Sequence, residues 1–205
     1  MKFRRALSVC LLCLGLASCI SLITPKVSTE LASLKSGAYE LDPAHAAVLF
    51  KVNHLGLSTY VGRFNSVQSS LDFDPNDIAN MQLQVIVEIE SLDINDDSLA
   101  SDLMGGLWFD AKNHPQAVFR SSAAKRLGET NIELVGELTI KGVTQDLSVL
   151  IDFHGGANNI LSGKYTLGFS AGFDFSRSDF GIDAFVPLVG DQVTIEAFGE
   201  FLKLR

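Results

Sequence analysis

The sequence predicts an all-β protein, folded as a closed antiparallel barrel or a two-sheet sandwich with one short helix. The first observation is a repeated alternation of apolar and polar residues, which is clearest in 131–141 and 165–175. Alternation of this kind places apolar side chains on one face of a strand. The second observation is that turn residues such as Asp74-Pro75-Asn76-Asp77 and Lys141-Gly142 separate the alternating runs.

The N-terminus is predicted to be a targeting segment, residues 1–18, and is excluded from the fold. Three basic residues among the first five precede an apolar stretch, 6–15, that is too short to span a bilayer. Residues 16–19, Leu-Ala-Ser-Cys, resemble a bacterial lipobox, which implies cleavage before Cys19 and lipidation of Cys19. An ordinary secretory signal with a chance cysteine is the alternative.

Cys19 would be the only cysteine of the mature chain, because Cys10 and Cys13 leave with the signal. This excludes a disulfide framework, a cysteine-based zinc site and a thiol catalyst. Because several acyl chains anchor a protein stably, we expect a membrane tether without a membrane span. Ile20 follows the cysteine, and by resemblance to lipoprotein sorting rules the absence of Asp there favours the outer membrane.

The charge of the mature chain limits its partners. Loss of residues 1–18 lowers Lys plus Arg from 16 to 13, against 24 Asp plus Glu. A chain this acidic is not expected to bind nucleic acid or to adhere electrostatically to an anionic bilayer. The 14 phenylalanines have no polar group, so many must be buried or must line something apolar.

After the signal we expect a tether at 19–37 and one domain at 38–205. A short helix is expected at 96–104, with Asn95 or Asp96 as its cap and Gly105-Gly106 at its end. About eight strands are expected, at 47–54, 59–67 with an extension at 69–74, 81–90, 117–123, 131–141, 146–153, 165–175 and 193–202.

An eight-stranded barrel is either filled by side chains or holds one small ligand. Four small residues fall on the apolar parity of their strands and favour a cavity: Gly136, Ala171, Ala197 and Gly199. Glycine can instead serve a bend or bulge, so both interpretations remain open at this point.

Several stretches resemble one known family in their order and spacing: Tyr39 to His45, Phe50 to Gly56, Gly62 to Phe64, Trp108 to Asp110, His114-Pro115, Phe119 to Ser121, Gly136 to Thr144, Ser176 to Gly181, and Val189 to Val193. On these residues the chain is similar to the YceI-like family of bacterial periplasmic proteins. The resemblance implies an eight-stranded antiparallel lipocalin-like barrel that binds a polyisoprenoid or similar long lipid. It does not imply an established enzyme.

The chain departs from the family pattern in three places. Ala46 stands where the family often has Ser, and Trp108 stands where Phe is common. The lipobox at Cys19 replaces the more usual cleaved periplasmic signal. The first two departures put the shape of the pocket mouth and the ligand in doubt.

A charged turn follows the aromatic strand 165–175 and contains Arg177 and Asp179. We expect these two side chains to form a structural salt bridge. In the alternative, Arg177 points into the mouth of the barrel and binds a phosphate or carboxylate through its guanidinium group.

The residues expected to contact a ligand are aromatic, histidine and arginine side chains of the resembling stretches: His45, Phe50, His54, Phe64, Trp108, Phe109, Phe119, Phe169, Phe173, Arg177 and Phe180. Some of these aromatic residues are expected to be ordinary core. For the two histidines, structural roles, contact with a lipid head group and metal binding all remain open. No metal site or cofactor is expected, because the histidine spacing matches no usual zinc pattern.

Catalysis is not expected, because the sequence contains no Gly-x-Ser-x-Gly, no Walker loop and no His-Glu-x-x-His. We therefore expect a carrier or store of a polyisoprenoid or fatty-acyl lipid in the bacterial cell envelope. It would be tethered to the membrane through Cys19 on the periplasmic side, and a homodimer is possible. The alternatives are an enzyme that acts on such a lipid with a histidine base, and a structural lipoprotein with a solid core.

Overall fold

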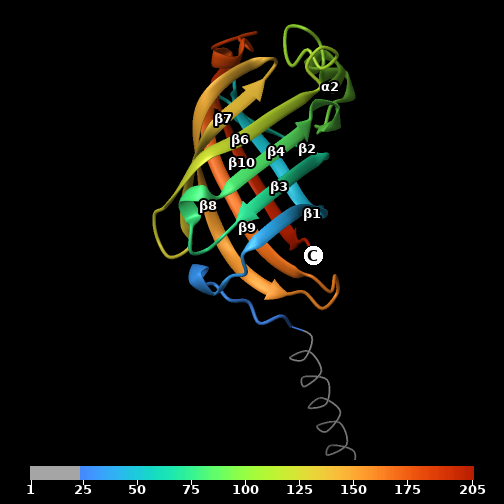
Figure 1. Ribbon diagram of the computed structural model, residues 1–205. Helices are drawn as coiled ribbons and strands as arrows, with labels where there is room; N and C mark the ends of the chain where they lie inside the picture. The colour runs from blue at the N-terminus through green and yellow to red at the C-terminus, as the bar shows by residue number, and fades with distance from the viewer. Residues whose placement is uncertain (1–23) are drawn as a thin grey trace, which may run out of the picture.

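The computed structural model describes residues 24–205, and in this range eight antiparallel strands close into a barrel (Figure 1). The ring runs β1, β3, β4, β6, β7, β8, β9 and β10, and it closes where β10 pairs with β1. One α-helix accompanies the strands of this described part. The closed barrel with one helix confirms the predicted fold class and excludes the sandwich.

The strands are β1 Gly37–His54, β2 Ser58–Phe64, β3 Val67–Phe73, β4 Gln82–Glu88, β5 Leu92–Asp93, β6 Gln116–Arg126, β7 Asn131–Ile140, β8 Val143–Asn158, β9 Tyr165–Ser176 and β10 Val189–Lys203. The helix is α2 Asp97–Leu103, and the 3₁₀ turns are η1 Leu31–Ser33, η2 Ile78–Asn80, η3 Ile89–Ser91 and η4 Arg177–Phe180. The predicted cap of the helix is confirmed, because the Asp96 carboxylate accepts a hydrogen bond from the Leu99 amide at 3.0 Å. Within residues 24–205, no helix has the length and apolar character needed to cross a membrane.

Strand β1 begins ten residues before the expected start at 47. It pairs with β3 along 37–40, with β2 along 48–54, and with β10 along most of its length. Asp42-Pro43 lies at an interruption within this strand, where the register shifts between Leu41 and Ala46. Proline has no amide to donate to a ladder, so the chain bulges there and then resumes pairing.

Strand β8 is also longer than predicted, because Gly155-Gly156 belongs to the strand and not to a loop. Gly155 has a φ of +115°, and the register of β8 on β9 shifts beside it. Ser28 exchanges two backbone hydrogen bonds with Gly156, at 2.9 and 2.8 Å. The glycines therefore let the segment before β1 lie against the barrel wall.

The segment before β1 was expected to be a tether, yet two of its leucines belong to the core. Leu31 and Leu34 are buried, and the Tyr39 hydroxyl donates to the Lys35 carbonyl oxygen at 2.5 Å. A chain that buries two leucines gains about 3 kcal/mol or more relative to leaving them exposed. Residues 28–36 therefore close one end of the barrel.

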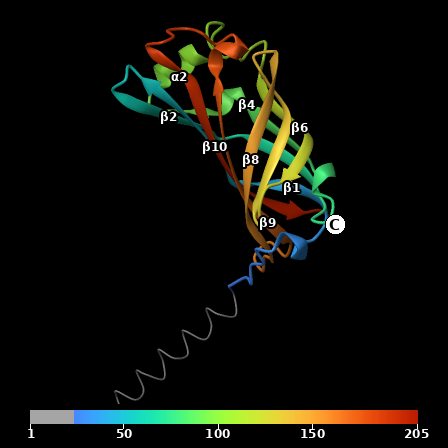
Figure 2. The same ribbon diagram turned by 90° about the vertical axis from the view of Figure 1, so that its left-hand side faces the viewer.

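The core is solid at this closed end. A chain of ring contacts runs from Phe73 to Phe153, Phe169 and Phe201, with centroid separations of 5.4, 4.2 and 5.3 Å. The turns beside α2 lie at the opposite end of the barrel from the segment before β1 and the C-terminus (Figure 2). We call that opposite end the open end, because the cavity described below lies toward it.

Gly136 does not leave volume for a cavity, which corrects one of the two interpretations of the small residues. A Cβ on Gly136 would lie 2.2 Å from the Arg120 carbonyl oxygen and 2.8 Å from the Ser121 Cα. The register of β6 on β7 shifts between Ser121 and Ala123, next to this glycine. Gly136 therefore serves a bulge in the barrel wall. By contrast, Ala171, Ala197 and Gly199 do line a small cavity.

Candidate functional site: an apolar cavity in the barrel

A cavity of about 700 Å³ occupies the barrel toward its open end. Its walls come mainly from β1, β2, β7, β9 and β10, and from α2 and the residues that follow it. The hydrocarbon lining includes Val48, Phe50, Val52, Phe64, Val87, Leu99, Leu103, Trp108, Phe109, Ala117, Leu138, Ile140, Phe173, Phe175, Ile182, Phe185, Val193 and Ile195. The polar side chains of the lining are His54, Tyr60, Asn95, Asp96 and Arg177.

A second cavity, of about 80 Å³, lies toward the closed end. Leu71, Met81 and Phe169 contribute to its lining, and Val48 borders both cavities. The interior of the barrel is therefore filled by aromatic rings at one end and hollow at the other.

Seven of the predicted contact residues line the large cavity: Phe50, His54, Phe64, Trp108, Phe109, Phe173 and Arg177. Phe169 lines only the small cavity, and Phe119 and Phe180 pack within the core. His45 is exposed on the outside of the barrel and lines neither cavity. Contact of the seven with a ligand stays a prediction, and the position of His45 gives its predicted contact no support.

Sequence reasoning missed most of the aliphatic lining, although the signal was present. Val48 and Val52 lie two residues before and after Phe50 on β1, and Val193 and Ile195 lie two residues apart on β10. Because residues two apart on a strand face the same side, these positions could have been found from their aromatic neighbours. Phe185 lies in an irregular segment with no period, so no pattern pointed to it.

Arg177 does not pair with Asp179, which corrects the expected salt bridge. Its side chain is 5% exposed and donates four hydrogen bonds to backbone carbonyl oxygens. Nε donates to Gly190 at 2.8 Å and Nη1 to Ile182 at 2.7 Å. Nη2 donates to Ala184 at 3.0 Å and to Val189 at 2.8 Å. The guanidinium group thus holds the segment 182–190 at the open end.

The turn η4 explains why Arg177 faces this segment and not its neighbour on the chain. In a 3₁₀ turn, residues two apart do not share a face, so Asp179 points elsewhere. Gly181, with a φ of +69°, ends the turn and redirects the chain beneath the guanidinium group. The expected salt bridge required residues 177 and 179 to share a face, and the 3₁₀ turn does not place them on one face.

Burial lowers the pKa of Arg177, and the Asp191 and Asp183 carboxylates oppose this shift. The guanidinium carbon also lies 5.4 Å from the centre of the Trp108 ring. A guanidinium group has five N–H groups, and four are used by the carbonyls. One N–H group is left for a ligand, so Arg177 is first a structural clamp.

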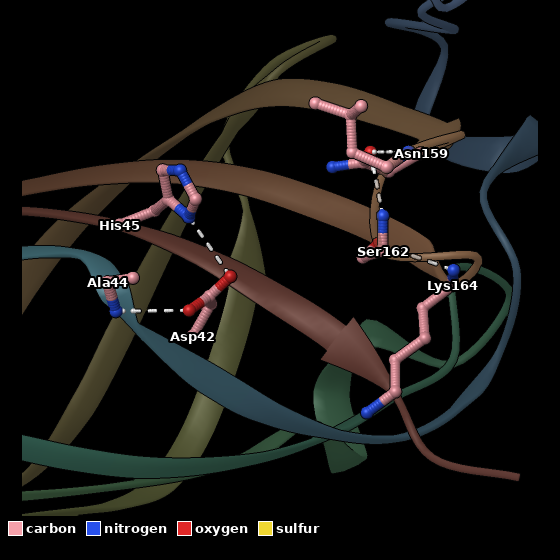
Figure 3. Close-up of polar contacts among 7 residues, drawn as sticks. Asp42, Ala44, His45, Asn159, Ser162 and Lys164 are labelled. Atoms are coloured by element: carbon pink, nitrogen blue, oxygen red, sulfur yellow. Dashed lines mark hydrogen bonds and ion pairs between the residues drawn. The ribbon is translucent and has the colours of Figure 1, made fainter.

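His45 and Asp42 form an ion pair on the outer surface, at the interruption in β1 (Figure 3). His45 Nδ1 lies 3.0 Å from Asp42 Oδ2, and the Ala44 amide donates to Asp42 Oδ1 at 3.0 Å. The hydrogen bond to Asp42 raises the pKa of His45, with a further contribution from Glu200. The same hydrogen bond lowers the pKa of Asp42, helped by the charge of Lys164. The pair orders the bulge and has no access to the cavity.

Residues 24–205 contain no group of three or more His, Cys, Asp or Glu side chains that could hold a metal ion. The lining of the large cavity consists of hydrocarbon and a few polar groups.

Replacement of Arg177 by Met should destabilise the fold by about 3 kcal/mol, because four carbonyl groups lose a charged donor. Chemical denaturation measures the change. Arg63→Met is the matched control, since Arg63 is exposed on β2 and should change stability by about 0.5 kcal/mol at most. Equal stabilities of the two variants would show that Arg177 is not a clamp.

Asp42→Asn should lower the pKa of His45 toward its ordinary value of about 6.5, because it removes the largest cause of the upward shift. Glu200→Gln should lower it less. In the parent protein the pair stabilises the fold at pH values between the pKa of Asp42 and the pKa of His45. That contribution is lost as pH rises through the raised pKa of His45, or falls through the lowered pKa of Asp42. NMR titration of the imidazole protons measures the shift, and an unchanged titration in Asp42→Asn would contradict the ion pair.

Comparison with known proteins identifies the family. The model of the YceI-like domain matches residues 39–201. A UPF0312 protein of Vibrio parahaemolyticus is 31% identical over 153 residues, which cover 75% of this chain and 78% of the relative. A UPF0312 protein of Shewanella oneidensis is 32% identical over 143 residues, or 70% and 74% of the two chains.

Solved structures agree in fold. BcnA of Burkholderia cenocepacia superposes with a TM-score of 0.71 at 26% identity, covering 78% of this chain and 98% of BcnA. A polyisoprenoid binding domain from Saccharophagus degradans has a TM-score of 0.65 at 12% identity, covering 81% and 98%, and it supports the fold alone. On the family match and the barrel together, this chain belongs to the YceI-like domain family.

Proposed function

We propose that this protein binds a long-chain amphipathic lipid, of the polyisoprenoid or fatty-acyl class, inside the barrel. The observation that carries the proposal is the cavity of about 700 Å³ with its hydrocarbon lining. Ligand sites of proteins commonly have volumes of about 300–1,000 Å³ and apolar walls. A hydrocarbon chain in such a cavity gains about 25 cal/mol for each Å² removed from water.

The few polar groups of the lining support one orientation of the lipid. His54 ends β1, and Arg177 precedes the segment that it clamps, so both lie toward the open end. The lining toward the closed end is mostly rings and aliphatic groups, such as Phe169 and Leu71, and it contains no charged residue. The hydrocarbon tail would therefore point toward the closed end, and the polar head would lie near Arg177 and His54.

Membership of the family supports binding in place of catalysis, and one structural neighbour is described as a polyisoprenoid binding domain. The large cavity argues against the alternative of a barrel with a solid core. For the cell, we propose carriage, storage or protection of the lipid in the bacterial envelope. The proposed signal and lipidated Cys19 lie outside the described residues.

Ala117→Phe should weaken binding of retinol, a fluorescent isoprenoid, by about tenfold or more, because the new ring occupies the cavity. Trp108 is the single tryptophan of the chain and lines the cavity, so energy transfer from Trp108 to retinol reports occupancy. Ala123→Phe is the matched control, since Ala123 is exposed on the same strand, β6. Equal affinities of the two variants would contradict binding in the cavity. If Ala117→Phe weakens binding and Ala123→Phe does not, organic extraction and mass spectrometry of the parent protein would identify the natural lipid.

Cys19→Ala should release the protein from membranes of the producing bacterium, because the acyl chains attach at that residue in the proposed lipoprotein. Fractionation of the envelope followed by detection of the protein measures the change. Cys13→Ala is the control, since Cys13 lies within the proposed signal and leaves with it. Retention of the Cys19→Ala protein in its processed form on the membrane would show that the lipobox interpretation is wrong.

A further inference from the structure

The open end of the barrel carries a group of exposed apolar side chains, which we call the collar: Leu55, Leu57, Leu107, Phe185, Val186 and Leu188. Leu57 is 85% exposed, Leu107 is 73% exposed and Leu188 is 60% exposed. They come from three segments that are distant in sequence, namely 55–57, 104–109 and 184–190. Side chains of this size are rarely gathered in water without a partner.

The segment 184–190 contacts each of the other two segments, so the collar is one surface. The Leu55 amide donates to the Leu188 carbonyl oxygen at 2.8 Å. The Trp108 and Phe185 rings are stacked with their centroids 6.1 Å apart. Both rings also line the large cavity, which makes the collar continuous with the cavity wall. In Figure 2 the turns of the collar lie at the end of the barrel beyond β2 and α2.

The charge of the collar favours a hydrocarbon partner. None of the three segments contains an Asp, Glu, Lys or Arg, in a chain that carries 40 of them. Without cations the collar offers no attraction to anionic head groups, and without charges of either sign it matches no charged protein surface.

The backbone of the segment 182–190 is also suited to a site without water. Four of its carbonyl groups accept hydrogen bonds from Arg177. Backbone groups that enter hydrocarbon must find partners within the protein. The clamp provides partners for these four carbonyl groups, and Phe185, Val186 and Leu188 of the same segment are exposed.

From these observations we propose that the collar inserts into the surface of a lipid bilayer, and that the cavity exchanges its lipid there. The proposal rests on the proposed lipid-binding function. Each methylene group that passes through water lowers the probability of transfer about fourfold, so a long chain needs a continuous apolar path. The collar joins such a path to the cavity.

Flotation with phosphatidylcholine vesicles tests the insertion. The chain from Ile20 onward is suitable because it keeps every described strand and lacks the acyl chains, and the region that superposes on this chain accounts for 98% of BcnA. Leu57→Ser combined with Leu107→Ser should weaken vesicle binding about tenfold or more, because neither residue lines a cavity and both are exposed. Leu161→Ser is the matched control, since Leu161 is 98% exposed at the closed end and should leave binding unchanged.

Binding should be no stronger on phosphatidylglycerol vesicles and should not weaken with salt, because the collar has no cations. The proposal is overturned if Leu161→Ser abolishes binding, or if the parent protein does not float with vesicles. It is also overturned if binding requires phosphatidylglycerol and low salt. If the collar variant instead converts a dimer to a monomer in sedimentation and floats as the parent does, the collar contacts a second copy, which equally overturns it.

Retinol separates this inference from the proposed function. The collar variant should bind retinol added from ethanol as the parent protein does, and it should take retinol from vesicles about tenfold more slowly. Ala117→Phe should float with vesicles and bind retinol about tenfold or more weakly than the parent protein. If the parent protein floats but binds no retinol, the lipid-binding function fails and docking survives. If it binds retinol but does not float, the function survives and the collar proposal fails.

Discussion

The structure depends on the pairing of β10 with β1, because this pairing turns an open sheet into a closed barrel. β1 is long enough to exchange one partner for another, β3 at the closed end and β2 at the open end. The change of partner follows the interruption at 42–45, where Pro43 cannot continue a ladder. The His45–Asp42 ion pair lies at this interruption, so these two residues have a structural role in ordering it.

Closure leaves an interior that side chains fill at one end and only line at the other. Toward the closed end, Phe73, Phe153, Phe169 and Phe201 lie ring against ring and fill the space. Toward the open end the lining mixes valine and isoleucine, such as Val52 and Ile195, with aromatic rings such as Phe50, and the space between them is the large cavity. Because rings fill one end and line the cavity at the other, the abundance of phenylalanine alone does not predict the cavity.

Local periods and turn residues were sufficient for the all-β class, the helix and its cap, and the resemblance to a known family favoured the barrel over the sandwich. It was not sufficient for contacts that join distant segments. The carbonyl partners of Arg177 could not be foreseen, since hydrogen bonds to backbone oxygens leave no mark on residue identity. Leu31 and Leu34 looked like parts of a tether because a short 3₁₀ turn has too few residues to show a period. Gly136 supports either a cavity or a bulge until the opposing strand is placed.

Arg177 links the interior of the barrel to its surface. A buried cation is costly unless its donors are satisfied, and the carbonyls of 182–190 satisfy most of them. Because the same hydrogen bonds satisfy those carbonyl groups, they need no water as a partner. The segment can therefore present Phe185 and Leu188 at an exposed edge while these backbone carbonyls stay hydrogen-bonded. The Trp108 ring packs against both the guanidinium group and Phe185, and it also faces the cavity. A single charged residue thus fixes the mouth, and the hydrocarbon surface inside the barrel continues to the hydrocarbon surface outside it.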